Sequence, residues 1–396
     1  MTLLDRGRLR HLMRAALALA LAAAVIAGCG GGVGVGGTGA FASGPITGFG
    51  SVFVNGIEFD DAAARIEDDD GAAASREQLR LGMTVEVDSG PLGGTAGAPT
   101  ANASRIRIAS DIVGPVGAVD LPGARLVVFG QLVRVTAATV YDDDYVDGLA
   151  SVASGSVVEV YGRFDVVAGG FVAARIAPRP DAPAYKLRGF VRELDTAGRR
   201  FTMGLRRFDY SALPAAAVPP DLADGRFLRL RVARVPVAGV WTVLAFGEGA
   251  PRVPDAERVL LRGRITAFAS ATSFSVDGQA VDARGASFPE GTAGLGLGAE
   301  VEVDGAAVDG VVQARAVRVR DESERESIEL KGRVERLDPA ARTLVLRGVT
   351  VSYAGASIAY EGGSAADLRV GVALEVKGVL SPDGTRVQAQ HIRFED

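Results

Sequence analysis

Cysteine and histidine, the side chains best suited to nucleophilic and metal chemistry, are scarce in this chain. Its 396 residues contain one cysteine, Cys29, and two histidines, His11 and His391. One thiol cannot form a disulfide within the chain or a thiolate metal cluster. Two distant histidines give no basis for a zinc site built on several histidines or for a Ser-His-Asp triad. We therefore expect no catalytic residues of these kinds and no cofactor, and we predict that the protein is not an enzyme.

Two acidic runs are the candidates for a metal site. Their carboxylates belong to Asp68, Asp69, Asp70, Asp142, Asp143 and Asp144. Ca²⁺ binds about six to eight oxygen ligands, and clustered loop carboxylates can supply several of them. The spacing does not match the EF-hand pattern, and the later part of the chain has no comparable run. We prefer to interpret both runs as solvated hairpin turns without metal, and Ca²⁺ binding is the alternative.

Four arginines make one central segment locally basic. They are Arg199, Arg200, Arg206 and Arg207, and the aromatic residues Phe201, Phe208 and Tyr210 lie nearby. Small β-barrels can bind nucleic acid through a basic, aromatic face, but alternating arginines also protect exposed strand edges. An anionic polysaccharide or lipid headgroup would be a better ligand here than DNA. The single tryptophan, Trp241, is expected in the core, and His391 is expected to face solvent.

The net charge argues against general binding to nucleic acid or anionic membranes. The full chain has a formal charge of −5. Removal of residues 1–28 takes away four arginines and one aspartate and leaves −8. An acidic surface repels phosphate groups. No nucleic-acid partner is therefore expected.

The start of the chain has the three parts of an export signal. Four arginines lie within residues 6–14, and residues 15–27 form an uninterrupted apolar run. This run is shorter than the ~20 residues that a membrane-spanning helix needs. A basic segment, a short apolar segment and small residues at a cut site are typical of a secretory signal peptide. Residues 1–28 are predicted to be such a signal.

The sequence Ile26-Ala27-Gly28-Cys29 resembles the lipobox of bacterial lipoproteins. The resemblance implies that the Cys29 thiol is diacylated, that the signal is cut before it and that the new amino group receives an acyl chain such as palmitate. Several acyl chains anchor a protein stably. Gly30 in place of aspartate favours the outer membrane, so we expect an outer-membrane lipoprotein that faces the periplasm or the exterior. Residues 29–43 would then be the lipidated cysteine and a flexible glycine-rich tether.

Beyond the tether the chain repeats itself. One mark is a glycine three residues before an apolar-polar-apolar triplet, and it recurs at Gly82, Gly155, Gly225, Gly298 and Gly371. The intervals between these glycines are 73, 70, 73 and 73 residues. A second mark, glycine followed by alternating apolar residues, begins at Gly189, Gly263 and Gly332. Such even spacing indicates tandem structural units.

Alternating apolar and polar residues predict short strands in each unit, for example over residues 330–337 and 372–376. Short turns at residues 75–81 and 365–368 are the only helical structure expected. Closure into a barrel would remove the open sheet edges of so small a unit. The predicted fold is all-β, with about five tandem small OB-like β-barrels, and small β-sandwiches are the alternative. The predicted repeats span residues 44–110, 111–180, 185–250 (divergent), 258–321 and 326–396.

The first repeat carries the strings ITGFGSVFVNGIEF (residues 46–59) and LRLGMTVEV (residues 79–87). They resemble the bacterial family called domain of unknown function 5666. The resemblance covers residues 44–396, most clearly in repeats one, four and five and least in repeat three. It implies tandem domains behind a lipoprotein signal. The family has no established activity that could be transferred.

Together these features favour a non-enzymatic lipoprotein of the cell envelope. Its barrels would act as a structural spacer or as a multivalent binding module, because linked weak sites gain avidity. Its partners would be the membrane, through the lipid anchor, and an envelope protein or polysaccharide. The first alternative is an enzyme or binding protein acting on envelope polysaccharide; an enzyme would need two carboxylates ~5–10 Å apart in a cleft. The second alternative is a Ca²⁺-binding envelope sensor.

Overall fold

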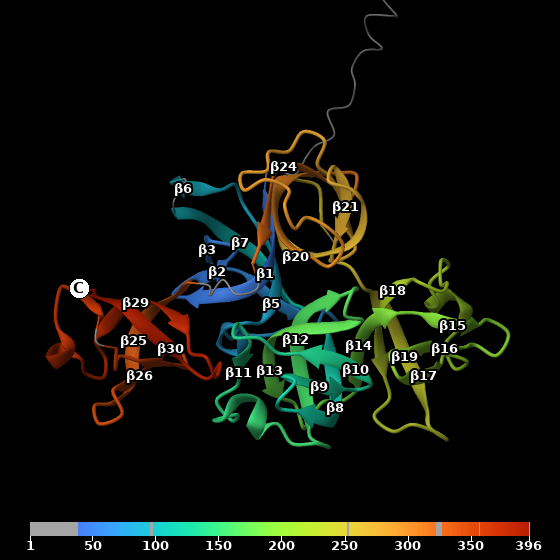
Figure 1. Cartoon of the computed structure of the whole chain (residues 1–396), viewed down its shortest axis with the longest axis horizontal. Coiled ribbons are helices and arrows are strands. Elements are labelled where there is room, and N and C mark those ends of the chain that lie inside the picture. The colour runs from blue at the N-terminus through green and yellow to red at the C-terminus, as the bar shows by residue number, and fades with distance from the viewer. Residues whose placement is uncertain (1–38, 96–97, 252, 322–326, 356, 396) are drawn as a thin grey trace, which may run out of the picture.

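The computed structural model describes residues 39–95, 98–251, 253–321, 327–355 and 357–395, over which the fold is all-β, as predicted (Figure 1). Its helical structure is limited there to the 3₁₀ turns η1 (Arg76–Gln78), η2 (Gly148–Ser151), η3 (Ala215–Ala217) and η4 (Ala365–Asp367). Two of these, η1 and η4, lie where short turns are predicted. None of the described helices is long and apolar enough to cross a membrane. The predicted signal peptide, Cys29 and most of the tether lie outside the described residues.

The strands fall into five successive groups, which we number as barrels along the chain. The first barrel contains β1 (Ala40–Phe49), β2 (Val52–Val54), β3 (Ile57–Asp60), β4 (Arg65–Asp68), β5 (Thr84–Ser89), β6 (Gly93–Thr95) and β7 (Ala98–Ile108). The second contains β8 (Ile112–Asp120), β9 (Arg125–Val128), β10 (Gln131–Arg134), β11 (Val140–Tyr141), β12 (Val157–Asp165) and β13 (Gly170–Pro178).

The third barrel contains β14 (Tyr185–Phe190), β15 (Arg192–Asp195), β16 (Arg200–Met203), β17 (Arg206–Asp209), β18 (Phe227–Val232) and β19 (Val240–Glu248). The fourth contains β20 (Ala256–Ser270), β21 (Ser273–Val276), β22 (Gln279–Asp282), β23 (Glu300–Val308) and β24 (Val311–Arg320). The fifth contains β25 (Ser327–Asp338), β26 (Thr343–Leu346), β27 (Val349–Ser352), β28 (Ala359–Glu361), β29 (Ala373–Leu380) and β30 (Val387–Phe394).

Every group closes by the same circuit of strand pairs. In the fifth barrel β25 pairs with β26, β26 with β27, β27 in parallel with β30, β30 with β29, and β29 with β25. The equivalent circuits are β1-β2-β3-β7-β5, β8-β9-β10-β13-β12, β14/β15-β16-β17-β19-β18 and β20-β21-β22-β24-β23. This closed five-stranded form confirms the OB-like barrel over the sandwich. The divergent third repeat has the same closure.

The side-chain alternation along the strands explains why they close around a core. In β23 the residues alternate between partly exposed and buried positions, with Val301, Val303 and Ala307 facing inward. Successive side chains of a strand point to opposite faces, so the apolar set lies on the inner face of the barrel. Glu300 and Glu302 take the outer face, which leaves them available for contacts between barrels.

The repeat glycines share one conformation and one hydrogen bond. Gly82, Gly155, Gly225, Gly298 and Gly371 have φ between +79° and +89°, a region that glycine enters without steric cost. Each glycine N–H donates to a carbonyl at the bend of its barrel's first strand over 2.7–2.9 Å, and the acceptors are Ile46, Val116, Val191, Ile265 and Val334. The repeated glycine in the sequence therefore links the bend of each barrel's first strand to the turn that comes just before the apolar-polar-apolar strand.

The barrels are joined through their first strands. Residues Ala40–Ser43 of β1 pair in parallel with Arg258–Leu261 of β20, and Gly48–Phe49 pair in parallel with Glu329–Leu330 of β25. β8 and β14, the first strands of the second and third barrels, pair antiparallel. The predicted boundary of the tether at residue 43 is therefore wrong by four residues, because Ala40–Ser43 are part of a strand that also pairs with β5.

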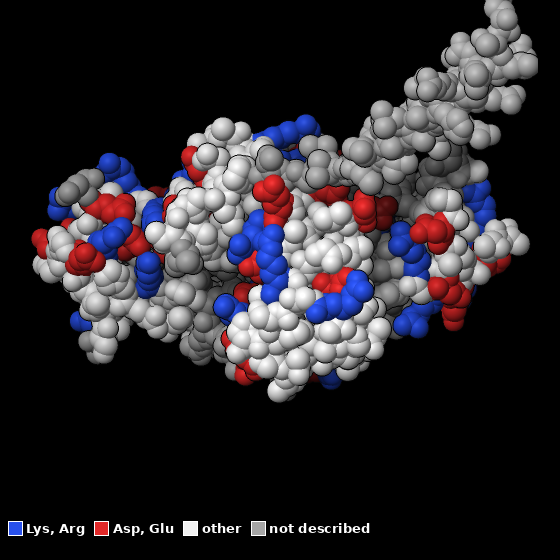
Figure 2. All heavy atoms as spheres, turned by 90° about the horizontal axis from the view of Figure 1, so that it is seen from above, with Lys and Arg blue, Asp and Glu red and all other residues white. Residues whose placement is uncertain are grey.

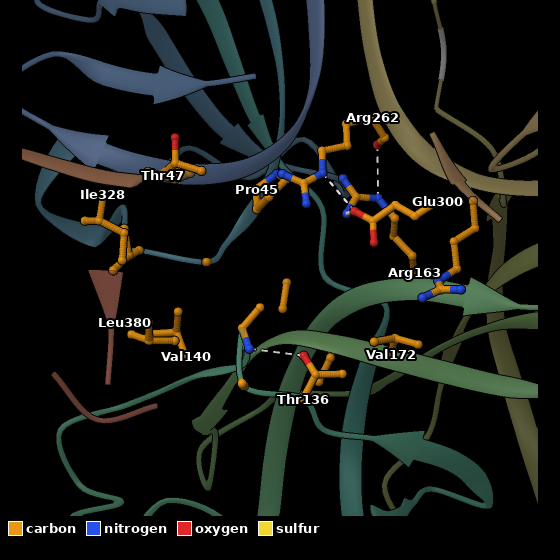
Figure 3. A pocket seen from close by; sticks show the side chains of 18 of the residues that line it. Pro45, Thr47, Thr136, Val140, Arg163, Val172, Arg262, Glu300, Ile328 and Leu380 are labelled. Atoms are coloured by element: carbon orange, nitrogen blue, oxygen red, sulfur yellow. Dashed lines mark hydrogen bonds and ion pairs between the residues drawn. The ribbon is translucent and has the colours of Figure 1, made fainter. Parts of the chain in front are cut away.

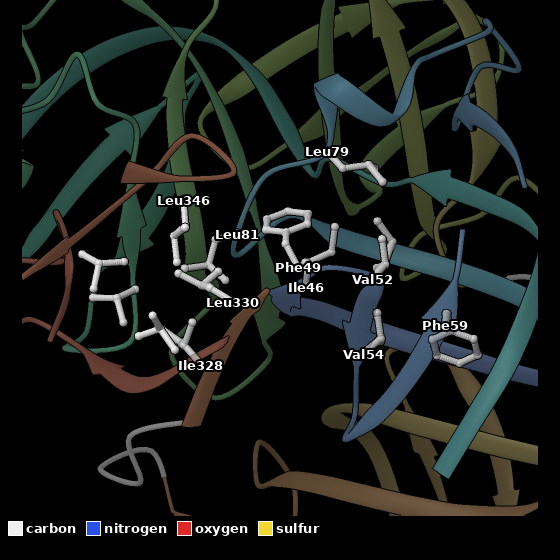
Figure 4. Packing of buried hydrophobic residues seen from close by; sticks show 14 of the residues in the cluster. Ile46, Phe49, Val52, Val54, Phe59, Leu79, Leu81, Ile328, Leu330 and Leu346 are labelled. Atoms are coloured by element: carbon white, nitrogen blue, oxygen red, sulfur yellow. The ribbon is translucent and has the colours of Figure 1, made fainter. Parts of the chain in front are cut away.

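Three hydrophobic cores serve the five barrels. The first and fifth barrels share one core, in which Leu81 lies with Leu330 and Leu346 (Figure 4). The second and third barrels share another. The fourth barrel has its own core, to which Phe41 of β1 contributes. The repeats are thus packed as one body rather than strung as separate beads.

Candidate functional site

Four barrels meet around a pocket that we call the junction pocket. Its lining includes Ile46 and Leu81 of the first barrel, Val140 of the second, and Ile328 and Leu380 of the fifth. These side chains form an apolar wall. The second and fourth barrels supply a polar wall from Arg163 of β12, Arg262 of β20 and Glu300 of β23. Figure 3 shows the polar side chains at one end and Val140, Ile328 and Leu380 at the other.

The polar wall is held by contacts between the second and fourth barrels. The Nε of Arg163 donates to the carbonyl of Arg262 over 3.0 Å. The Nε of Arg262 donates to Oε1 of Glu300 over 2.8 Å, and Nη1 of Arg163 lies 3.6 Å from the same oxygen. Only 10% of the Arg163 side chain and 12% of the Glu300 side chain are exposed. Charge-assisted hydrogen bonds with so little exposure fix the geometry of this wall.

The electrostatics of the wall keep Glu300 ionised. Burial alone would raise the pKa of this carboxyl, but Arg163 and Arg262 outweigh that effect and hold the pKa below its usual value. A general acid needs a raised pKa at neutral pH. Glu300 is therefore suited to orienting the two arginines rather than to donating a proton.

The polar wall contains two guanidinium groups that meet at one carboxylate. A guanidinium carries five N–H donors and no acceptor, and Arg163 and Arg262 both contact Glu300. Within the part of the chain that the structure describes, Nη2 of Arg163 is enclosed and has no hydrogen-bond partner. The pocket therefore combines an apolar wall with a charged wall, which is the pattern of a site for a small amphipathic molecule.

The first acidic run serves a second buried cluster, between the first and third barrels. The side chain of Asp69 is only 4% exposed and lies 2.5 Å from Lys186, 3.2 Å from Arg188 and 3.3 Å from Arg229. Burial would raise the pKa of Asp69, but the three cations lower it overall. The prediction of a solvated turn is therefore wrong for Asp69, which binds cationic side chains. Asp70 pairs with Arg229 at the edge of the cluster, and Asp68 caps its own turn by accepting from the N–H of Asp70 over 2.9 Å.

Asp111 extends this cluster to the second barrel. Its Oδ2 accepts the N–H of Gly162 over 2.8 Å, and its Oδ1 lies 3.7 Å from Nε of Arg188. Burial raises the pKa of Asp111 to about 6. Arg188 also donates from Nη1 to the carbonyl of Gly249 over 2.9 Å. One arginine of the third barrel thus contacts carboxylates from both earlier barrels.

The second acidic run is divided in its role. Asp142 pairs with Arg175, whose Nη1 also donates to the carbonyl of Leu81 over 3.2 Å and so reaches the first barrel. Asp143 and Asp144 are exposed, as a solvated turn requires. Among the described residues no group of three or more histidine, cysteine, aspartate or glutamate side chains is arranged to hold a metal ion.

The basic segment of the third barrel does not present an aromatic face. Phe201, Phe208 and Tyr210 are buried, with at most 4% exposed, and cannot stack on bases. Arg199 lies over Tyr210 and Arg206 over Trp241. Arg200 pairs with Asp209 over 3.0 Å, while Arg207 lines an open groove on the same barrel. On the face seen in Figure 2, basic and acidic side chains are interspersed.

Two single residues have clear surroundings. Trp241 is in the core, as predicted, and packs edge-on against Phe129 with ring centroids 4.6 Å apart. His391 is partly exposed and faces a partner that the local sequence does not suggest, since its Nε2 lies 3.4 Å from Glu361.

Arg163, Arg262, Glu300 and Asp111 are the site residues that the sequence patterns miss. One signal for part of the set exists. Arg188, Arg262 and Lys331 each stand immediately before the glycine of a first strand. All three form ion pairs near the contacts between barrels. A charged residue at this repeated position, on the outer face next to the inward-facing Leu187, Leu261 or Leu330, marks where first strands meet.

Comparison with known families agrees with this architecture. A family model described as Domain of unknown function (DUF5666) matches residues 113–177, 262–318 and 331–393. These three regions are similar to this family. The matched DUF5666 regions lie in the second, fourth and fifth barrels, so the predicted resemblance is confirmed in repeats two, four and five. The string at residues 46–59 lies outside the matched regions, although the first barrel has the same strand circuit. No curated protein matches the chain.

Proposed function

We propose that this protein is a non-enzymatic binding protein of the bacterial cell envelope, anchored by acyl chains on Cys29. The observation that carries the proposal is the junction pocket, built from side chains of four barrels. A fixed concave site with an apolar wall and a few convergent polar groups is the usual form of a small-molecule site. Lipidation of Cys29 would hold this site at the membrane surface, facing the periplasm or the exterior.

The arrangement of the barrels supports a single composite site over an array of independent ones. A multivalent array gains avidity when each unit carries its own site. Here the first strands pair across barrels and the cores are shared, so the pocket exists only when several barrels are assembled. A spacer alone would not need a pocket with charged side chains drawn from separate repeats.

The chemistry of the pocket also supports binding rather than hydrolysis. A glycosidase needs one carboxyl with a raised pKa beside a second, ionised one. The pKa of Glu300 is lowered by Arg163 and Arg262. Arginine-paired carboxylates are suited to holding a ligand in place.

Anchoring and binding can be tested together in cells that express the full chain. We expect radiolabelled palmitate to enter the wild-type protein and to be lost in Cys29→Ser, which should leave the membrane fraction. Purified mature protein exposed to a small-molecule extract of the envelope should retain a ligand in native mass spectrometry. Depolymerisation of envelope polysaccharide by the purified protein, or unlabelled wild type, would contradict the proposal.

A further inference from the structure

The third barrel has an exposed apolar end, which we call the apolar tip. It consists of Leu205, Val235 and Val237, whose exposed fractions of 80%, 73% and 72% are the highest among the large hydrophobic residues that the structure describes. Leu205 lies on the turn between β16 and β17, and the two valines lie on the connection from β18 to β19. Because β17 and β19 pair in parallel, with Arg207 opposite Val240, the turns that precede them lie at the same end of the barrel.

Backbone hydrogen bonds hold the apolar tip in place. The N–H of Leu205 donates to the carbonyl of Gly130 in the second barrel over 3.0 Å. Val237 and Val240 exchange two hydrogen bonds of 2.9 and 3.0 Å, which close a tight turn. The third barrel forms one end of the molecule in Figure 1. Neighbouring apolar side chains that stay exposed on a fixed backbone are typical of a surface that contacts a partner or a membrane.

The barrel that carries the apolar tip is basic, although the chain as a whole is acidic. Residues 185–250 contain one lysine, ten arginines and six acidic residues, a formal charge of +5, whereas the whole chain carries −5. Part of this charge is balanced by Asp69 of the first barrel, which pairs with Lys186, Arg188 and Arg229. An excess of charge on one part of a molecule attracts surfaces of the opposite sign to that part. The net charge of the chain therefore does not describe how this end interacts with an anionic surface.

A groove beside the apolar tip brings arginines next to it. Leu205 lines this groove together with Arg192, Arg206 and Arg207. None of these three arginines forms an ion pair with another of the described residues, and Arg192 and Arg207 are exposed. The carboxylates of the lining are Glu193 and Asp224, and Asp224 already accepts a backbone N–H over 2.9 Å. The groove thus presents exposed guanidinium groups, whose planar fork of donors matches phosphate oxygens.

We propose that this end of the third barrel docks on an anionic phospholipid bilayer, with the apolar tip in the interfacial region and Arg192 and Arg207 on lipid phosphates. Burial of apolar area and attraction to anionic lipids both contribute to interfacial binding. The docking goes beyond the proposed small-molecule site, because it uses neither the junction pocket nor its lining. Together with acyl chains on Cys29, it would give the protein two points of attachment and so fix the orientation of the barrels at the membrane.

Other partners match the apolar tip less well. A twofold contact with a second copy of the chain would bring two basic ends together, and like charges repel each other. A polysaccharide offers anionic groups but leaves the three apolar side chains in contact with water. A bilayer offers phosphate and hydrocarbon side by side at its interface, which is the combination that the tip and the groove present.

Vesicle binding tests the proposal on the mature chain carrying Cys29→Ser, so that no acyl chain contributes. Co-sedimentation compares vesicles of phosphatidylcholine alone with vesicles that contain about one third phosphatidylglycerol. We expect binding to the anionic vesicles to be at least about tenfold tighter, and to weaken at ~0.5 M salt, which screens the attraction. Equal affinity for both kinds of vesicle, or no binding to either, would overturn the proposal. Neither result would bear on the lipidation of Cys29 or on the junction pocket.

Two matched pairs of variants place the contact at the apolar tip. Leu205→Ser should weaken binding to the anionic vesicles about tenfold. Val370→Ser, at a 62% exposed position of the fifth barrel, should leave binding unchanged. Arg207→Gln should weaken binding about fivefold, whereas Arg369→Gln, beside Val370, should have an effect of less than about twofold. All four side chains are exposed, so the melting temperature should not change.

Three outcomes would contradict the proposal. Wild-type affinity of both Leu205→Ser and Arg207→Gln would locate the vesicle contact elsewhere on the molecule. Binding of soluble polygalacturonate without binding of vesicles would assign the groove to an anionic polysaccharide. Dimerisation that Leu205→Ser abolishes, again without binding of vesicles, would assign the apolar tip to a second copy of the chain.

Discussion

The amide of Gly225 donates to the carbonyl of Val191 over 2.8 Å, at the bend where the first strand of the third barrel leaves β18 for β16. The return bond, from the amide of Val191 to the carbonyl of Arg226, is 2.9 Å long. Val191 is fully buried. This reciprocal pair of hydrogen bonds recurs in the other barrels, so all five barrels use it to hold the bent first strand against the turn that contains the repeated glycine.

Replacing the glycine at this bend should cost more stability in the first barrel than in the fifth. Gly371 is needed only for its backbone conformation, whereas Gly82 is also needed because it has no side chain. A Cβ on Gly371 would meet nothing within 4 Å, so Gly371→Ala should cost only the left-handed strain of about 1–2 kcal/mol. A Cβ on Gly82 would lie 2.8 Å from the carbonyl oxygen of Ala174 in the second barrel. Gly82→Ala should therefore cost a further ~1–3 kcal/mol. Urea unfolding of the mature protein measures both, and equal losses would contradict the contact between barrels.

This device is also why so much of the fold can be predicted from the sequence. A φ near +80° favours glycine, and the strand that follows must alternate, so the same short pattern recurs at Gly82 and Gly371. The third repeat differs in the sequence of β19 but keeps Gly225, and its strand circuit is unchanged. The barrel depends on interactions between residues within one repeat, and such interactions produce patterns that can be recognised in the sequence.

The buried cluster around Asp69 should be sensitive to removal of one charge. Asp69→Asn would leave Lys186, Arg188 and Arg229 short of a buried counter-charge, with an expected loss of about 3–5 kcal/mol of unfolding free energy. The neighbouring Asp70 has 31% of its side chain exposed, and Asp70→Asn should cost under about 1 kcal/mol. Denaturant unfolding followed through Trp241 fluorescence separates the two. Similar losses of unfolding free energy for both variants would show that Asp69 is not the main counter-charge of the three cationic side chains.

The contacts between barrels are the part that the sequence does not predict. Asp69 looks like a turn aspartate, because its partners Lys186 and Arg229 lie in a different repeat. Glu300 looks like an outward-facing strand residue, which it is within its own barrel. Only the packing of β12 against the fourth barrel brings Arg163 to it. No short-range pattern encodes such a pairing, so the junction pocket requires the assembled structure.

Asp111 should give stability a pH dependence of unusual sign. Its pKa is raised from 3.8 to about 6 in the folded protein, so the folded state binds the proton more strongly than the unfolded state. The contribution of this group to stability is therefore greatest at low pH and falls as pH rises from about 4 to 6, by about 2–3 kcal/mol. Other carboxyls such as Asp69 act in the opposite direction, since their pKa is lowered.

The comparison that isolates Asp111 is the stability of wild type minus that of Asp111→Asn, measured by urea unfolding between pH 4 and 7. Common contributions from other groups cancel in this difference. We expect the unfolding free energy of the wild type, relative to that of Asp111→Asn, to decrease as pH rises and then to level off above about pH 7. A difference that is constant with pH would show that the group does not titrate in this range.

Phe41 should stabilise the fourth barrel although it lies at the start of the first. The Phe41 side chain is 2% exposed and belongs to the core of the fourth barrel. In the backbone pairing of β1 with β20, Phe41 lies opposite Val259. Phe41→Ala should cost about 3–5 kcal/mol, with faster hydrogen exchange in β20 and β23 before β25 and β29. Phe268 of β20 is 38% exposed and provides the matched control, for which Phe268→Ala should stay within about 1 kcal/mol. Exchange that rises equally in both barrels would show that β1 stabilises the whole body and not the fourth barrel first.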